Sequence, residues 1–77
     1  MNKLKNIRQA KGLSQSQLAK KANMNVRTLQ HYEQGSKPFD HARIDTIFRV
    51  CLALGCKVED VIENQEYIGL IRRYENS

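Results

Sequence analysis

Hydrophobic residues recur at helical spacing along most of the chain, and breaks in this spacing divide it into short helices. Residues 3–12 place Leu4 and Ile7 on one face and lysines on the other, which predicts a first amphipathic helix. The strongest periodic signal follows Asp40, a candidate N-cap, with apolar residues at i, i+3, i+4, i+7 and i+8: Ile44, Ile47, Phe48, Cys51 and Leu52. Residues 58–63 predict a further short helix, because acids stand in its first turn, where the helix dipole favours negative charge. The pattern predicts an all-α fold.

The segment LSQSQLAKKANMNVRTLQHYEQG reads as two short helices joined by a tight turn. Ser14 is a good N-cap, and Gln17 stands three residues later as its capping-box partner. Asn23 suits a sharp turn, because asparagine enters the left-handed region at low cost. Asn25 then caps a second helix, and Gly35 is a left-handed stop.

These residues carry a resemblance to a known family. The positions that carry it are Leu13-Ser14-Gln15, Leu18-Ala19, Asn23, Leu29 and Tyr32-Glu33-Gln34-Gly35. Together they resemble the lambda-repressor-like (Xre-type) helix-turn-helix family over roughly residues 3–64, with Asn23 where the family often has glycine. The resemblance implies a compact five-helix DNA-binding domain over residues 1–64, with the motif at 14–34 and the recognition helix at 25–34. It also implies a bacterial or phage regulator that binds DNA, usually as a homodimer.

In helix-turn-helix proteins the second helix of the motif enters the major groove, while the first crosses the phosphate backbone. Because Leu29 and Tyr32 face inward, other residues of the second helix are left to face the groove. We expect the DNA-binding residues to be Gln15, Asn25, Val26, Arg27, Gln30, His31, Ser36 and Lys37. Arginine pairs with guanine, glutamine with adenine, and an apolar side chain with the thymine methyl group. The resemblance gives Gln15 a phosphate contact, and the alternative for His31 is a solvated surface histidine.

The resemblance also implies a structural ion pair between Arg8 and Glu33. In the family an arginine at this position of the first helix commonly pairs with a glutamate at the end of the third. Such a pair would tie the two helices together, and the alternative is that Arg8 points to solvent. If the pair is buried, loss of one partner should be costly, because the other charge is left uncompensated.

Charge is distributed unevenly along the 77 residues, whose formal net charge is +5. Eight lysines and arginines precede Pro38 against the single acid Glu33, whereas five basic residues and seven acids follow from Pro38 onward. The basic half contains the motif, and this asymmetry is the expected footprint of a polyanion. Double-stranded DNA fits better than RNA, because aromatic platforms for unpaired bases are absent.

Several other classes of protein are disfavoured by the sequence. No arrangement of nucleophile, base and acid points to an enzyme, and the chain is too short for a large substrate pocket. Cys51 and Cys56 lack partners at metal-ligand spacing, so we expect neither a metal site nor a cofactor. The longest apolar run is residues 50–54, and no signal peptide stands at the start, which predicts a cytoplasmic protein without membrane association.

The tail, residues 65–77, is ambiguous between a helix and a strand. Tyr67, Ile68, Leu70, Ile71 and Tyr74 would form one helical stripe, but the run YIGLI also suits a strand. So many apolar side chains predict either packing on the core or a dimer contact. The function predicted is a repressor that binds operator DNA as a homodimer, and the alternative is an antitoxin that binds a toxin and represses its own operon.

Overall fold

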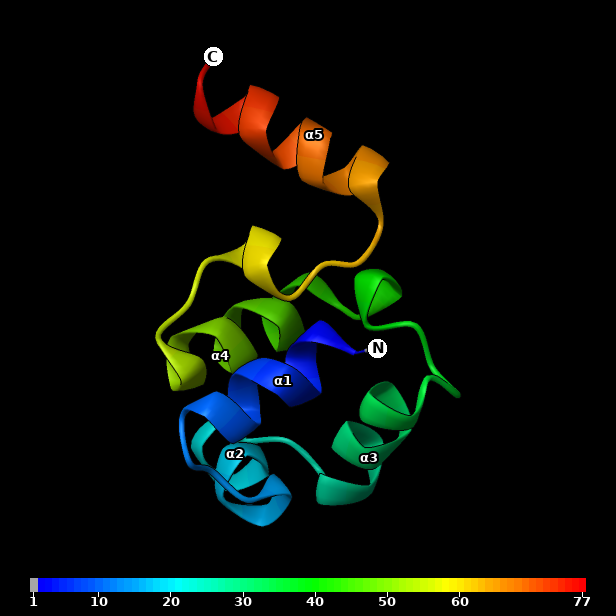
Figure 1. Cartoon of the computed structure of the whole chain (residues 1–77), viewed down its shortest axis with the longest axis vertical. Coiled ribbons are helices and arrows are strands. Elements are labelled where there is room, and N and C mark those ends of the chain that lie inside the picture. The colour runs from blue at the N-terminus through cyan, green and yellow to red at the C-terminus, as the bar shows by residue number, and fades with distance from the viewer. Residues whose placement is uncertain (1) are drawn as a thin grey trace.

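The computed structural model describes residues 2–77, and within this range the chain consists of helices and turns without strands (Figure 1). The elements in chain order are α1 (Lys3–Ala10), α2 (Gln15–Lys21), α3 (Val26–Gln34), η1 (Phe39–His41), α4 (Ile44–Leu54), η2 (Val58–Asp60) and α5 (Gln65–Glu75). The symbol η denotes a single turn of 3-10 helix. The predicted all-α fold is confirmed, and the described chain contains five α-helices, the fifth of which is formed by the tail.

One apolar core joins the helices. Its most deeply buried side chains come from α1, α2, α3, α4 and the segment after η2: Leu4, Leu18, Leu29, Val50 and Val61. Helix α2 packs against both α3 and α4. Figure 1 shows α2 and α3 at one end of the long axis and α5 at the other. The helix-turn-helix and the C-terminal helix therefore occupy opposite ends of the molecule.

Local capping defines the two helices of the motif as the sequence predicts. The Ser14 side chain accepts a hydrogen bond from the Gln17 backbone N–H, and the Gln17 side chain accepts one from the Ser14 N–H. Asn23 is the one residue other than glycine with positive φ in the described chain, at 53°. Asn25 caps α3 through the Arg27 N–H, and Gly35 ends it at φ 83°. Short-range hydrogen bonds thus set the ends of both helices.

Helix α4 begins later than predicted, because Asp40 caps a different part of the chain. Asp40 lies in η1, and the residue before α4 is Arg43, which makes no side-chain cap. The two Asp40 carboxylate oxygens instead accept the backbone N–H groups of Glu63 and Asn64, at 2.9 and 2.8 Å. The prediction that Asp40 caps the fourth helix was therefore wrong.

The buried face of α4 also differs from the predicted stripe. Ile47 and Cys51 are buried, but the residues that accompany them inward are Val50 and Leu54. The other three members of the predicted stripe are exposed: Ile44, Phe48 and Leu52. Because α4 is apolar over more than half of its circumference, two stripes have helical spacing, and packing against the other helices selects one of them.

The predicted helix over residues 58–63 is only one 3-10 turn. The Asp60 carboxylate accepts the Lys57 N–H at 2.9 Å, which closes the turn. The N–H groups of Glu63 and Asn64 are already bound by Asp40, so they cannot continue a helical ladder. Val61 and Ile62 are buried without forming a longer helix.

The tail forms the helix α5, which resolves the ambiguity between helix and strand. The Asn64 side chain accepts the N–H groups of Glu66 and Tyr67, which starts the helix. Ile68 is buried against the core. On the flank, Arg72 Nε pairs with a Glu59 carboxylate oxygen at 2.7 Å. Among the described helices, none has both the length and the apolar character needed to cross a bilayer.

The two hydrogen bonds that the Asp40 carboxylate accepts from Glu63 and Asn64 should stabilise the start of α5. We expect Asp40→Ala to lower the free energy of unfolding by about 1 kcal/mol, because two backbone N–H groups lose their acceptor. Asp40→Asn keeps one acceptor oxygen and should lose less. Urea unfolding followed by circular dichroism measures both variants, and equal stability of Asp40→Ala and wild type would show that water replaces the carboxylate without cost.

Candidate nucleic-acid interface

Helix α3 presents two different faces. Leu29 and Glu33 are buried, whereas Arg27 and His31 are exposed and Gln30 is partly exposed. Asn25, at the cap, is exposed, and its carboxamide oxygen accepts the Arg27 N–H at 2.8 Å. Arg27 therefore stands exposed to solvent in the first turn of α3.

Val26 and His31 are more constrained than the sequence indicates. Val26 is partly buried and packs against the core, so only part of its side chain is available for a thymine methyl group. His31 Nδ1 lies 3.1 Å from Ser36 Oγ, and this hydroxyl also reaches the His31 backbone carbonyl at 3.3 Å. The end of α3 and the following loop are thus linked through Ser36.

The loop after α3 exposes the side chains of Ser36 and Lys37. The Lys37 backbone N–H donates to the His31 carbonyl at 3.3 Å, as part of the turn that ends the helix at Gly35. This N–H group is therefore occupied within the chain. The exposed ammonium group of Lys37 is the cation that this loop presents to solvent.

A buried ion pair joins α1 to α3. Arg8 Nε and Nη2 donate to the two carboxylate oxygens of Glu33 at 2.7 and 2.9 Å, and the side chains are 9% and 2% exposed. Arg8 Nη1 also donates to the Leu13 carbonyl at 2.8 Å. This bidentate geometry is the strongest that arginine forms with a carboxylate, and it fixes direction as well as distance.

Gln15 completes this network. Its side-chain Nε2 donates to Glu33 Oε1 at 3.0 Å, so the first residue of α2 is bonded to the last turn of α3. Within the described chain, no buried side-chain nitrogen or oxygen lacks a partner. Gln15 therefore holds the two helices of the motif together.

Two residues that position the motif, Arg49 and Asn2, were not identified from the sequence pattern. Arg49 of α4 donates from Nε to the Ala22 carbonyl at the end of α2, at 3.1 Å, and from Nη1 to Asp45 at 2.7 Å. The hydrogen bond from Arg49 lowers the pKa of the Asp45 carboxyl. Asn2 Nδ2 donates to the Tyr32 carbonyl at 3.0 Å. The i, i+4 spacing of Asp45 and Arg49 signals their pair, but the contact with Ala22 depends on how α4 packs.

The two cysteines have the character of apolar side chains. Both are free thiols, and Cys51 is buried. Burial raises the pKa of the Cys51 thiol to about 12, and it also raises the pKa of Cys56. The Cys51 thiol is thus protonated at neutral pH and lacks the thiolate form that acts as a nucleophile.

Two capped helices, the left-handed turn at Asn23 between them and the exposed Arg27 on the second helix are the features of a helix-turn-helix domain. A family model described as helix-turn-helix matches residues 4–61. The chain belongs to this family, in its Xre or lambda-repressor-like form. No curated protein and no solved structure matches the chain. The family is one of DNA-binding transcription regulators and is not typically enzymatic.

The pair between Arg8 and Glu33 should be strongly coupled. In a double-mutant cycle with Arg8→Ala and Glu33→Ala, we expect a coupling energy of about 1–3 kcal/mol, because either single variant leaves a buried charge unpaired. The more exposed pair Arg72–Glu59, whose side chains are 65% and 18% exposed, serves as the control, with about 0–1 kcal/mol expected. The measurement is chemical unfolding of all variants, and similar coupling for the two pairs would contradict a special role for the buried one.

Proposed function

We propose that this protein is a repressor that recognises operator DNA by inserting α3 into the major groove. The observation that carries the proposal is the exposed Arg27 in the first turn of a helix whose opposite face is locked by the buried pair of Arg8 and Glu33. A rigidly held helix suits base recognition, because specific hydrogen bonds need a fixed geometry.

The exposed residues of α3 have distinct proposed roles. Arg27 would read guanine through two hydrogen bonds, and Gln30 would read adenine. His31 would contact a base or sugar while Ser36 orients its ring. Val26 contributes the apolar edge that remains outside the core, and Asn25 shapes the N-terminus of α3 beside the groove.

Three side chains would hold the backbone of the duplex. Lys37 and Ser36 follow α3 in an exposed loop, and Gln15 begins α2, the helix expected to cross the phosphates. Such contacts fix the register of the protein on DNA without reading sequence. The excess of basic residues before Pro38 supports a long-range attraction to the same polyanion.

A homodimer is part of the proposal, because one recognition helix covers only a few base pairs. Two copies related by a two-fold axis would place their α3 helices about 34 Å apart on a roughly palindromic site. Footprinting on operators selected from a random DNA pool should therefore reveal two half-sites one helical turn apart. A footprint confined to one half-site would contradict dimeric binding.

An antitoxin is the second candidate, favoured by the large apolar side chains that α4 and α5 leave exposed. Such an antitoxin would use α3 for its own operator and the apolar side chains for a toxin. Stoichiometric co-purification of a second protein whose activity this chain blocks would support that function. It is compatible with the proposed operator binding.

Substitutions of Arg27 and Lys37 should distinguish base recognition from phosphate binding. Arg27→Ala should lose roughly 1–3 kcal/mol of discrimination between operator and single-base variants, because it removes a base contact. Lys37→Ala should weaken operator and random DNA about equally and reduce the salt slope by about one unit, because a phosphate contact carries no sequence information. Affinities at several salt concentrations measure both effects.

Lys57→Ala is the matched control, an exposed lysine outside the motif that should bind like wild type. If Arg27→Ala lowers operator and random-DNA affinity by one common factor, Arg27 contacts only phosphate. Gln30 and His31 would then carry more of the sequence recognition.

A further inference from the structure

Helices α4 and α5 expose the large apolar side chains that the core leaves uncovered. Ile44 is 66% exposed, Phe48 50%, Leu52 82%, Leu70 51% and Tyr74 82%. On each helix these residues are four apart, so each set lies on one helical face. We name these five residues the α4–α5 surface. Four of them, all except Leu52, line one groove and so form a contiguous apolar patch, and a patch of this kind marks an interaction site.

The surface contains a hollow as well as projections. A groove of about 490 Å³ lies between the two helices, and Ile44, Phe48, Leu70 and Tyr74 are among its lining residues. At the same time, Leu52 and Tyr74 project further into solvent than the other members. One surface that carries both a hollow and projecting side chains can be complementary to a second copy of itself.

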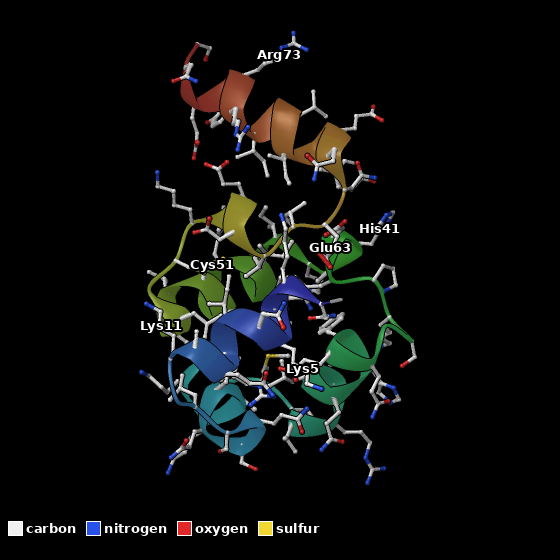
Figure 2. All side chains as sticks on the ribbon, viewed as in Figure 1. Lys5, Lys11, His41, Cys51, Glu63 and Arg73 are labelled. Carbon is white, nitrogen blue, oxygen red and sulfur yellow. The ribbon has the colours of Figure 1, made fainter. Side chains whose placement is uncertain are left out.

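One acidic and one basic residue beside the α4–α5 surface are spaced so that each could pair with the other residue of a second copy. Glu66 and Arg73 are seven residues apart on α5, so they lie on the same side of the helix, with Leu70 between them. Among the described residues, neither forms an ion pair, whereas the adjacent Arg72 pairs with Glu59. Figure 2 shows Arg73 directed away from the body of the molecule. Both charges are therefore available to a partner.

We propose that a second copy of the chain covers the α4–α5 surface, with the two α5 helices packed antiparallel about a two-fold axis near Leu70. This inference rests on the homodimer of the proposed function and assigns it an interface. An antiparallel crossing midway between positions 66 and 73 sets Glu66 of each copy opposite Arg73 of the other, so both pairs form. It also brings each Tyr74 over the N-terminal half of the opposite α5.

The net charge of this region also favours a like partner. Two acids and two arginines make α5 neutral, whereas the residues before Pro38 carry a strong positive excess that would repel another copy. Figure 1 places α5 at the far end of the long axis from α2 and α3. Pairing through α5 therefore keeps the two basic faces apart and leaves both exposed to DNA.

Charge reversal tests the register of the interface. We expect Glu66→Arg and Arg73→Glu each to weaken self-association of the full chain about tenfold or more, because each sets two like-charged pairs in contact. An equimolar mixture of the two variants should restore association as a heterodimer, because one chain then carries both arginines and the other both glutamates. The double variant Glu66→Arg/Arg73→Glu should also associate like wild type.

Sedimentation equilibrium of each sample without DNA is the measurement, and circular dichroism verifies that each variant is folded. Lys5→Glu is the matched control, because it makes the same change of charge as Arg73→Glu on α1, away from α5 (Figure 2). This control should associate like wild type. The affinity of every sample for random DNA is measured separately and should be preserved in the α5 variants, whose basic half is unchanged.

Single variants that associate as strongly as wild type would overturn the proposed register, since a parallel arrangement places Glu66 against Glu66. A wild type that stays monomeric at all concentrations, alone or in complex with another protein, would overturn the interface itself. If wild type dimerises with the expected charge dependence but binds no DNA, the proposed function fails while the interface stands.

Discussion

The orientation of α3 depends on one buried interaction, the bidentate pair between Arg8 and Glu33. The pair joins α1 to the last turn of α3, and Gln15 attaches α2 to the same carboxylate. Two charges this deep are stable only while all their hydrogen bonds are present, and here the Leu13 carbonyl completes the set on Arg8. The network therefore allows one relative placement of three helices. That placement leaves the first turn of α3 open to solvent.

Contacts from the rest of the fold stabilise the arrangement of α1, α2 and α3. Helix α4 packs on α2 and holds its C-terminal carbonyl through Arg49, while the N-terminal Asn2 holds the end of α3. Asp40 then links the segment after α3 to the start of α5. Long-range polar contacts of this kind fix the angles between short helices, which an aliphatic core alone constrains weakly. The proposed DNA-binding face and the proposed dimer interface then lie at opposite ends of a very small protein.

Interactions between neighbouring residues were sufficient to predict the ends of the two motif helices. The caps at Ser14 and Asn25 and the stop at Gly35 depend on residues within a few positions of each other, and all three were predictable. The cap assigned to Asp40 was not, because its carboxylate bonds residues more than twenty positions away. In the same way, the apolar residues of α4 allowed two buried faces, and the sequence pattern selected a stripe that includes the exposed Phe48.

The sequence by itself determined the helical class, the helix-turn-helix motif and the basic character of its half, because spacing, capping and charge are properties of neighbouring residues. Only the tertiary structure decided that the tail is a helix, that Gln15 is bonded to Glu33 and that Val26 packs inward. It also decided which apolar side chains remain exposed. The physical reason is that burial and long-range hydrogen bonding depend on which elements meet, and a periodic pattern records that a face is apolar without recording what covers it.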